Sequence, residues 1–431
     1  MHQVGSEVFS EEAWRVLKPW EMRFDDQLAR LQQMQIDIRR HLHAHPEPSG
    51  GEVETSKFVA QRLEKAGLHP WFCRSDAGNQ VGVIADLEIG RPSPESPLIA
   101  LRCDLDALRM PDEKTVEYAS RNPGLAHACG HDAHTAILLG VALAGAAVNA
   151  EFDETAADFG GRLRFLFQPA EETSQGAQWL VDQGAMEGVQ AVLGLHVDPE
   201  RPAGQVGIRY GALTANCDEI EIVVEGHGGH AARPHQSTDP VAAAAHLVST
   251  IYEFLPRAID SRSPSVITIG KIQGGHAPNV IPERVELHGT LRTIDPASQQ
   301  ILKVRLQKIC AGAEQSSGTK ITLRFSAPLK SVENHPRMAA ALEQASRRVV
   351  GPENTGMIDR PSLGGEDFSV YLDFAPGALL RLGCADQNGN PPFLHSPKFD
   401  IDERTLAIGS QIMMRAALLL AVQTPTRTGE G

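Results

Sequence analysis

Residues 163–172 read LRFLFQPAEE, a short apolar run that ends in a proline and two consecutive acids. Three more short apolar runs, at 81–85, 98–101 and 191–195, are separated from it and from one another by helical patterns. Nearly continuous apolar strands that alternate with helices are typical of a parallel sheet buried on both faces. We therefore predict an α/β fold built on a mostly parallel sheet.

Polar residues follow three of these runs directly. Asp104 and Asp106 come after the run at 98–101, Glu171 and Glu172 after 163–167, and His196 after 191–195. In an open α/β sheet, ligands bind beyond the carboxyl ends of the strands. The sequence therefore predicts that these side chains share one functional site.

Residues 127–134 read HACGHDAH, which places one thiol and three imidazoles in eight residues before an expected helix at 133–147. Thiolate and neutral imidazole bind zinc and similar divalent ions, and Gly130 allows the tight turn that two neighbouring ligands need. Taken alone, a cysteine is more often a small buried apolar residue. Segments 168–172, 194–196 and 394–397 each add a possible ligand at the end of an apolar stretch. Together they favour a metal site.

The composition limits the class of protein. The chain has 431 residues, 42% of them hydrophobic, and a formal charge of -14, so it is globular and long enough for two domains. Its acidic balance disfavours nucleic acid and anionic membranes as partners. No basic leader with an apolar core begins the chain, and we expect no membrane helix. Six separately placed cysteines favour reduced thiols and a cytoplasmic location.

The pattern changes near residue 210. Alternating apolar strands and amphipathic helices follow in the order β-α-β-β-α-β, which describes a compact two-layer α+β unit. Because His395 resumes the series of possible ligands, we place an inserted domain at 210–328 and a metal-binding domain at 1–209 and 329–431. The insert carries two polar loops, at 226–234 and 277–282, and such glycine-rich loops usually make only tight turns.

Motifs spread along nearly the whole chain resemble the metallopeptidase family of aminoacylases and glutamate carboxypeptidases. The nearest branch is that of hippurate hydrolases and plant indole-acetyl-amino-acid hydrolases. The motifs are RHLH at 40–43, PE at 46–47, DLDAL at 104–108, HACGHDAH at 127–134, QPAEE at 168–172, GLH at 194–196, GGHAARPH at 228–235, NVIP at 279–282, GGEDF at 364–368 and LHS at 394–396.

The resemblance implies a catalytic domain with two divalent metal ions per subunit and an inserted domain that serves as a lid and a dimerisation surface. Zinc or manganese is expected, with cobalt or nickel as alternatives. Carried over by position, Glu171 is the general base and His230 reaches the active site of the other subunit. The implied metal ligands are Cys129, His131, Glu172, His196 and His395.

Four further residues have roles that the pattern leaves open. Other branches of the family have a ligand histidine where this chain has Asp104, so we expect Asp104 and Asp106 to orient ligands instead. The branch tends to have proline where this chain has Arg109, which either favours anionic substrates or is simply exposed. Asn279 is a candidate hydrogen-bond donor to substrate. Arg292 either binds a substrate carboxylate or pairs with an acid in the insert.

These residues supply what amide hydrolysis needs, namely an activated water, stabilisation of the oxyanion and a proton for the leaving amine. We predict an amidohydrolase that cleaves N-acyl or N-aroyl amino acids to a carboxylic acid and an amino acid. A homodimer is expected, with a homotetramer as the alternative. The alternative with the same machinery is a metallo-carboxypeptidase or dipeptidase. An inert metal-binding protein is disfavoured because Glu171 would then have no function. A structural zinc module is also disfavoured, because such a site fills all four coordination positions with protein ligands, commonly pairs of cysteines.

Overall fold

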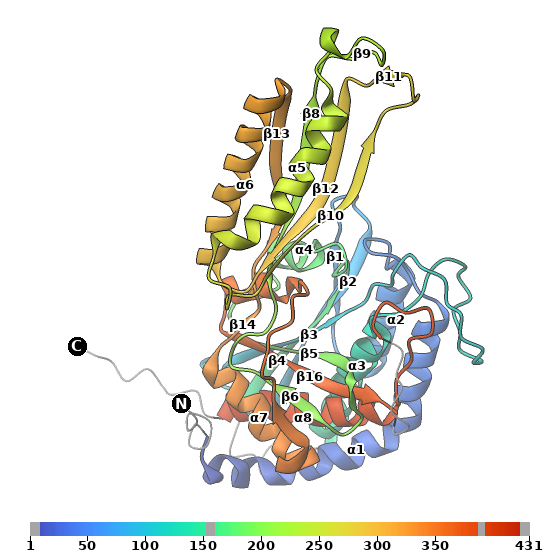
Figure 1. The fold of residues 1–431 in the computed structure, drawn as a ribbon. Helices are drawn as coiled ribbons and strands as arrows, with labels where there is room; N and C mark the ends of the chain where they lie inside the picture. The colour runs from blue at the N-terminus through green and yellow to red at the C-terminus, as the bar shows by residue number, and fades with distance from the viewer. Residues whose placement is uncertain (1–8, 152–159, 387–392, 423–431) are drawn as a thin grey trace. The chain divides into compact units, whose positions relative to one another are not determined.

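The computed structural model describes residues 9–151, 160–386 and 393–422, and the chain divides into two compact units (Figure 1). The first comprises Met1–Gly211, Glu333–Asp359 and Asp367–Gly431, and the second comprises Ala212–Val332 and Arg360–Glu366. Residues 360–366, which we had placed with the metal-binding domain, belong to the second unit. Backbone hydrogen bonds explain this, because Ala215 N–H donates to Gly364 and Ser362 N–H to Leu213.

The first unit is built on an eight-stranded sheet in the order β1-β2-β4-β3-β5-β16-β6-β15. The central strands β4, β3, β5 and β16 run parallel, whereas β2 pairs antiparallel with β1 and β4, and β6 pairs antiparallel with β16. This confirms the mostly parallel α/β sheet. The strands are β1 Trp71–Arg74, β2 Gln80–Gly90, β3 Leu98–Asp104, β4 Gly160–Gln168, β5 Val189–Pro202, β6 Val206–Ile208, β15 Thr355–Met357 and β16 Gly377–Ala385.

Helices surround this sheet, and short strands mark the passage between the units. The expected helix at 133–147 is α3, which begins earlier, at His131. The helices are α1 Glu11–Ala44, α2 Val53–Lys65, α3 His131–Glu151, α4 Gly176–Asp182, α7 Pro336–Val350 and α8 Arg404–Val422, with 3-10 turns at Pro352–Asn354 and Asp367–Asp373. The short strands β7 Gly211–Ala212 and β14 Glu333–Asn334 pair with each other.

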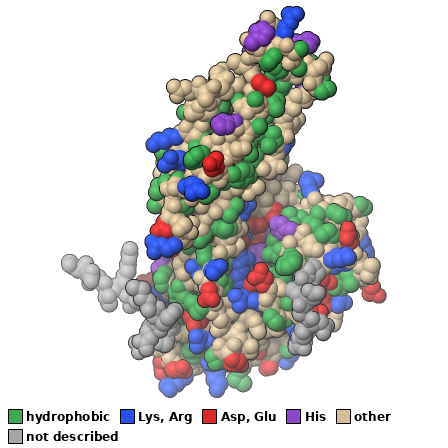
Figure 2. All heavy atoms as spheres, in the orientation of Figure 1, with side chains coloured by type: hydrophobic (Ala, Val, Ile, Leu, Met, Phe, Trp, Pro, Cys, Tyr) green, Lys and Arg blue, Asp and Glu red, His purple; other side chains and the backbone are tan. Residues whose placement is uncertain are grey.

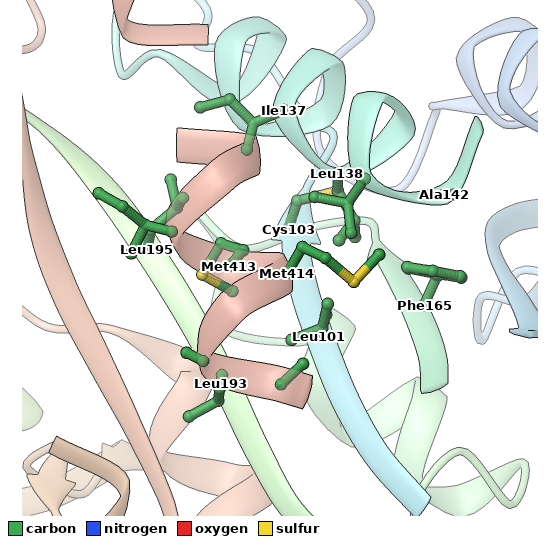
Figure 3. Close-up of a cluster of buried hydrophobic side chains, with 14 of the residues drawn as sticks. Leu101, Cys103, Ile137, Leu138, Ala142, Phe165, Leu193, Leu195, Met413 and Met414 are labelled. Carbon is green, nitrogen blue, oxygen red and sulfur yellow. The ribbon is translucent and has the colours of Figure 1, made fainter. Parts of the chain in front are cut away.

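The core of the first unit lies where α3 and α8 pack on β3, β4 and β5. Figure 3 shows Met413 and Met414 of α8 among Leu101, Leu193 and other buried side chains of these strands. By length and composition both helices could cross a membrane, so our expectation that no segment is apolar enough was wrong. In each, 78% of the apolar window is buried inside the protein. Their apolar character therefore has a structural explanation, because they are packed on nearly all sides.

The second unit is a four-stranded antiparallel sheet in the order β10-β12-β8-β13, with α5 and α6 on one face. Side chains alternate along β8, where Ile220 and Ile222 are buried and Glu219 is exposed. Asp239 and Asp295 cap the two helices through their side chains. The elements are β8 Asn216–Glu225, β9 Gly229–His230, α5 Pro240–Phe254, β10 Ser265–Gly274, β11 Val280–Ile281, β12 Arg284–Thr293, α6 Pro296–Ser317 and β13 Lys320–Leu329, with 3-10 turns at Pro234–Gln236 and Leu255–Ala258.

Candidate metal centre

Five side chains in the first unit converge in two overlapping groups. Within each group the possible ligand atoms all lie within 4.8 Å of one another. Cys129 Sγ is 3.5 Å from His196 Nε2, and His395 Nε2 is 3.5 Å from Glu172 Oε1. Cys129 belongs to both groups. The structure thus brings together all five residues expected as ligands, in the groups Cys129, His131, His196 and Cys129, Glu172, His395.

Hydrogen bonds orient both buried imidazoles of the first group. His131 Nδ1 donates to the carbonyl oxygen of Asp106 at 3.0 Å, and His196 Nδ1 donates to that of Val197 at 2.7 Å. A carbonyl oxygen only accepts, so Nδ1 of each ring carries a proton, and Nε2 is the nitrogen through which each histidine would bind a metal. Such bonds to the far nitrogen are the usual support of a metal-binding histidine.

Two buried polar atoms of the cluster have no hydrogen-bond partner among the described residues. They are His131 Nε2 and Glu172 Oε1, which lie 3.9 Å apart. An unsatisfied buried polar atom is costly, and a nitrogen, a sulfur and a carboxylate oxygen around one point are ligands that suit zinc and related ions. The residues present therefore fit a divalent metal.

The electrostatics of the site favour positive charge. Burial lowers the pKa of His131, but the negative charge of Asp104 and the hydrogen bond with Asp106 outweigh it and hold this pKa well above the usual value. Burial raises the pKa of the Cys129 thiol. A metal ion that binds here would displace the thiol proton, as metal binding to cysteine does generally. The field around His131 is thus one in which a cation is stabilised.

Asp104 lies behind the cluster at the end of β3 and is fully buried. It accepts hydrogen bonds from His134 Nδ1 at 2.6 Å and Arg102 Nη1 at 2.8 Å. Burial raises its pKa, yet His131, His134 and Arg102 together hold the pKa of Asp104 well below its usual value. An ionised carboxylate therefore adds negative charge 3.8 Å from His131 Nε2.

His134 is a site residue that we did not single out from the sequence. Its Nδ1 donates to Asp104, and its Nε2 accepts from Val197 N–H at 2.9 Å. Both nitrogens are occupied, so His134 connects β3 to β5 and has no lone pair to offer a metal. The available signal was its position three residues after His131, on the same face of α3.

Asp106 holds the turn that carries the two glutamates. Its Oδ1 accepts from Glu171 N–H at 3.1 Å, and its Oδ2 accepts from Glu172 N–H at 3.0 Å and from Ser49 Oγ at 2.6 Å. Glu171 Oε2 in turn lies 3.8 Å from His131 Nε2. The two glutamates are therefore presented to the cluster by a turn whose backbone is fixed.

Backbone geometry places the cysteine and the last histidine. Gly130 has φ +88°, and a Cβ there would lie 2.4 Å from Val197 Cγ2, so only glycine fits between Cys129 and His131. His395 also has a positive φ, of 62°, and its N–H donates to the carbonyl of Ala128 at 2.7 Å. This bond pins the loop of His395 beside Cys129.

A second polar network lies at the start of α3. Arg39 Nε and His43 Nδ1 both contact Asp132 Oδ2, at 2.8 Å and 2.7 Å, and all three side chains are fully buried. The sequence alone did not identify this role of Asp132. The network ties α1 to the helix turn that carries His131.

The remaining predicted residues lie in the second unit or on the surface. His230 and Asn279 are neighbours, because Ala231 N–H donates to the Asn279 carbonyl at 3.1 Å and β9 pairs with β11. Both are exposed, and Figure 2 shows histidines gathered at this tip of the second unit. Arg292 lies at the far end of β12, where its Nη1 donates to the Leu363 carbonyl at 2.8 Å. Arg109 is exposed.

Known proteins resemble this chain over most of its length. A Synechocystis protein named a probable hydrolase is 41% identical over 89% of this chain and 94% of its own. An N-acetylcysteine deacetylase of Bacillus subtilis is 35% identical over 89% of this chain and 96% of its own. A thermostable carboxypeptidase of Saccharolobus solfataricus is 33% identical over 87% of this chain and 92% of its own.

Solved structures agree with these sequence matches. A dinuclear metal-binding peptidase of the M20 family from Bacillus subtilis superposes with a TM-score of 0.76 at 32% identity, covering 91% of this chain and 99% of its own. The model of peptidase family M20/M25/M40 matches residues 100–419, which include every ligand candidate. The chain therefore belongs to the M20/M25/M40 peptidase family and is a metal-dependent hydrolase of amide bonds.

Proposed function

We propose that this enzyme hydrolyses the amide bond of N-acyl or N-aroyl amino acids with two divalent metal ions per subunit. The observation that carries the proposal is the pair of overlapping ligand groups that share Cys129, with Glu171 beside them. The match to a deacetylase of an N-acetyl amino acid supports the substrate class. The carboxypeptidase relative supports the alternative, cleavage of short peptides from the carboxyl end.

In this proposal the two adjacent glutamates have different roles. When bound, the metal ions lower the pKa of a water and polarise the acyl oxygen. Glu172 and the other four ligands hold the ions, while Glu171 takes the water's proton and later delivers it to the leaving nitrogen. His131 and His196 would each bind an ion through Nε2, because their Nδ1 atoms donate to carbonyl oxygens.

Substrate profiling tests the proposed function. The metal-loaded enzyme is assayed with N-acetyl, N-benzoyl and indole-acetyl amino acids and with dipeptides, with zinc, manganese, cobalt and nickel supplied separately. Preferred hydrolysis of an acylated amino acid supports the proposal, and chelation of the metal should abolish the activity. If dipeptides with a free amino terminus are cleaved much faster than every acylated amino acid, the carboxypeptidase or dipeptidase alternative is correct.

The metal content provides a separate prediction. Five ligand side chains exceed what one tetrahedral ion uses, so active protein is expected to hold about two ions per chain. Elemental analysis of the reconstituted, desalted protein measures this ratio. One ion or none in fully active protein would contradict the dinuclear site.

A cysteine substitution tests the shared ligand. Cys129→Ser should weaken metal retention in both groups, because a hydroxyl is a much poorer ligand than a thiolate. Cys73→Ser is the matched control, since Cys73 is equally buried but lies in β1. Metal content after dialysis against a weak chelator should fall only for Cys129→Ser. Equal retention by the two variants would remove Cys129 from the ligand set.

The second unit supports a dimer in which each site is completed by the partner. Strand β12 starts at Arg284, and His230 and Asn279 lie beyond this starting end. Arg292 lies at the opposite end of the strand. The strand between them spans roughly 26 Å, far longer than an N-acyl amino acid. If all three contact one substrate, they must come from different copies of the chain. We therefore propose a homodimer with His230 acting on the partner's site, and a tetramer of two such dimers is the alternative assembly.

The compartment is also a proposal. All six cysteines are free thiols, and five of them are buried. Free thiols are typical of proteins from a reducing environment. We propose a cytoplasmic enzyme, and fractionation of the source cells with immunodetection would test this.

A further inference from the structure

The loop between α1 and α2 carries a buried acid that the proposed reaction does not use. Glu52 is 0% exposed and lies directly before α2. Its Oε1 accepts hydrogen bonds from the N–H groups of Gly50 at 3.0 Å and Ala170 at 2.8 Å. Its Oε2 has no hydrogen-bond partner among the described residues. Burying a carboxyl group costs folding free energy, so a role for its contact with Ala170 is expected.

Ala170 is the residue directly before the two glutamates of the site. Its φ is +51°, a left-handed conformation that residues other than glycine, asparagine and aspartate rarely adopt. Such a conformation persists only where the surroundings hold it. The hydrogen bond from Ala170 N–H to Glu52 is one such restraint, and it acts on the peptide that sets the direction of Glu171.

Three consecutive backbone N–H groups in this turn are held by two buried carboxyl groups. Glu52 accepts from Ala170, and Asp106 accepts from Glu171 and Glu172. The loop of Glu52 also contacts Asp106 itself, because Ser49 Oγ donates to its Oδ2. The position of the glutamates is therefore set jointly by Asp106 and by the loop that ends at Glu52.

We propose that Glu52 is a positioning residue, which holds the Ala170 backbone so that the Glu171 carboxylate faces the metal cluster. This inference rests on the proposed function, because it takes Glu171 as the base. Glu52 itself touches neither the ligand groups nor the reacting atoms. Its effect should therefore appear in the rate of the chemical step and not in the affinity for substrate.

Glutamine is the conservative replacement at this position. Burial and the nearby charge of Asp106 raise the pKa of Glu52 to about 8, so the side chain is mostly a neutral acid at pH 7. A carboxamide has nearly the same size and offers the same carbonyl oxygen to Ala170 N–H. Alanine removes that acceptor entirely.

Kinetics of Glu52→Ala and Glu52→Gln test the proposal in the metal-loaded full-length enzyme. Because a small misplacement of a catalytic group can cost up to about 100-fold, Glu52→Ala should lower kcat by roughly 10- to 100-fold. KM and the metal content should stay near wild type. Glu52→Gln should restore most of kcat, since it keeps the hydrogen bond to Ala170.

Two reference variants separate positioning from general damage. Glu21→Ala also removes a buried carboxylate, which lies in the first third of α1 and pairs with Arg348 and Arg415. This variant should lower thermal stability without lowering kcat. Full kcat in Glu52→Ala, equal losses in Glu52→Ala and Glu52→Gln, or an equal loss in Glu21→Ala would each overturn the proposal. Glu171→Gln separates failure of the Glu52 proposal from failure of the proposed function. Full activity of that variant would mean that the proposed function itself is wrong.

Discussion

Glu171→Gln is expected to lower turnover by roughly 100-fold or more, the scale of losing a positioned general base. The amide keeps the shape of the side chain but cannot accept the proton of the attacking water. Glu171 Oε2 lies 3.8 Å from His131 Nε2, and in the proposed reaction Glu171 is the base and not a ligand, so metal content and folding should remain close to wild type. Steady-state kinetics and elemental analysis on the same preparation measure both quantities.

The same substitution one residue later is the matched control. Glu172 Oε1 lies 3.5 Å from His395 Nε2 and 3.9 Å from His131 Nε2, between two ligand candidates. Glu172→Gln should therefore impair metal retention first and activity as a consequence. If Glu171→Gln loses metal while Glu172→Gln keeps it, the roles of base and ligand must be exchanged.

His230→Ala is expected to be nearly inactive as a homodimer. His230 is exposed in β9, and its Nδ1 accepts from Ala232 N–H at 3.0 Å, so Nε2 is the nitrogen that can donate a hydrogen bond. A donor placed over the developing oxyanion contributes about 3 to 4 kcal/mol, and a donor on a separate domain can also exclude water during turnover. The loss should therefore be large although no ligand has been touched.

Mixing two inactive variants shows which subunit supplies this histidine. After dissociation and reassociation of His230→Ala with Glu171→Gln, random pairing gives mixed dimers in half of the population. Half of their sites then contain both a wild-type Glu171 and a wild-type His230, so about a quarter of all sites regain activity. If native mass spectrometry detects the mixed dimers and no activity returns, His230 acts within its own chain or only shapes its turn.

The sequence predicted the long, strongly patterned elements and missed the short ones. The buried strands β3, β4 and β5 stand out as apolar runs, whereas β1 and β6 have only four and three residues, too few for a period to be recognised. Helices α3 and α8 are long and apolar enough to span a membrane, which we did not expect, and the helix predicted at 133–147 was shorter than α3.

Within the site, spacing indicated the cluster at 127–134 but not the role of each histidine. His131 and His134 have the same chemistry, and only their hydrogen bonds distinguish a nitrogen free for metal from one already occupied. Glu52 was beyond sequence reasoning for a different reason. Its partner Ala170 lies 118 residues away, and an acid before a helix is usually read as an exposed cap.

The order of the strands has a consequence for synthesis on the ribosome. Strand β16 lies between β5 and β6, and α8 packs against α3, yet both are made after the whole second unit. The nascent chain therefore carries the apolar α3 without its final covering while more than two hundred further residues are added. Domains generally fold as units once complete, so the second unit can form first. Chaperone binding and aggregation should therefore compete with correct folding most strongly before α8 leaves the ribosome.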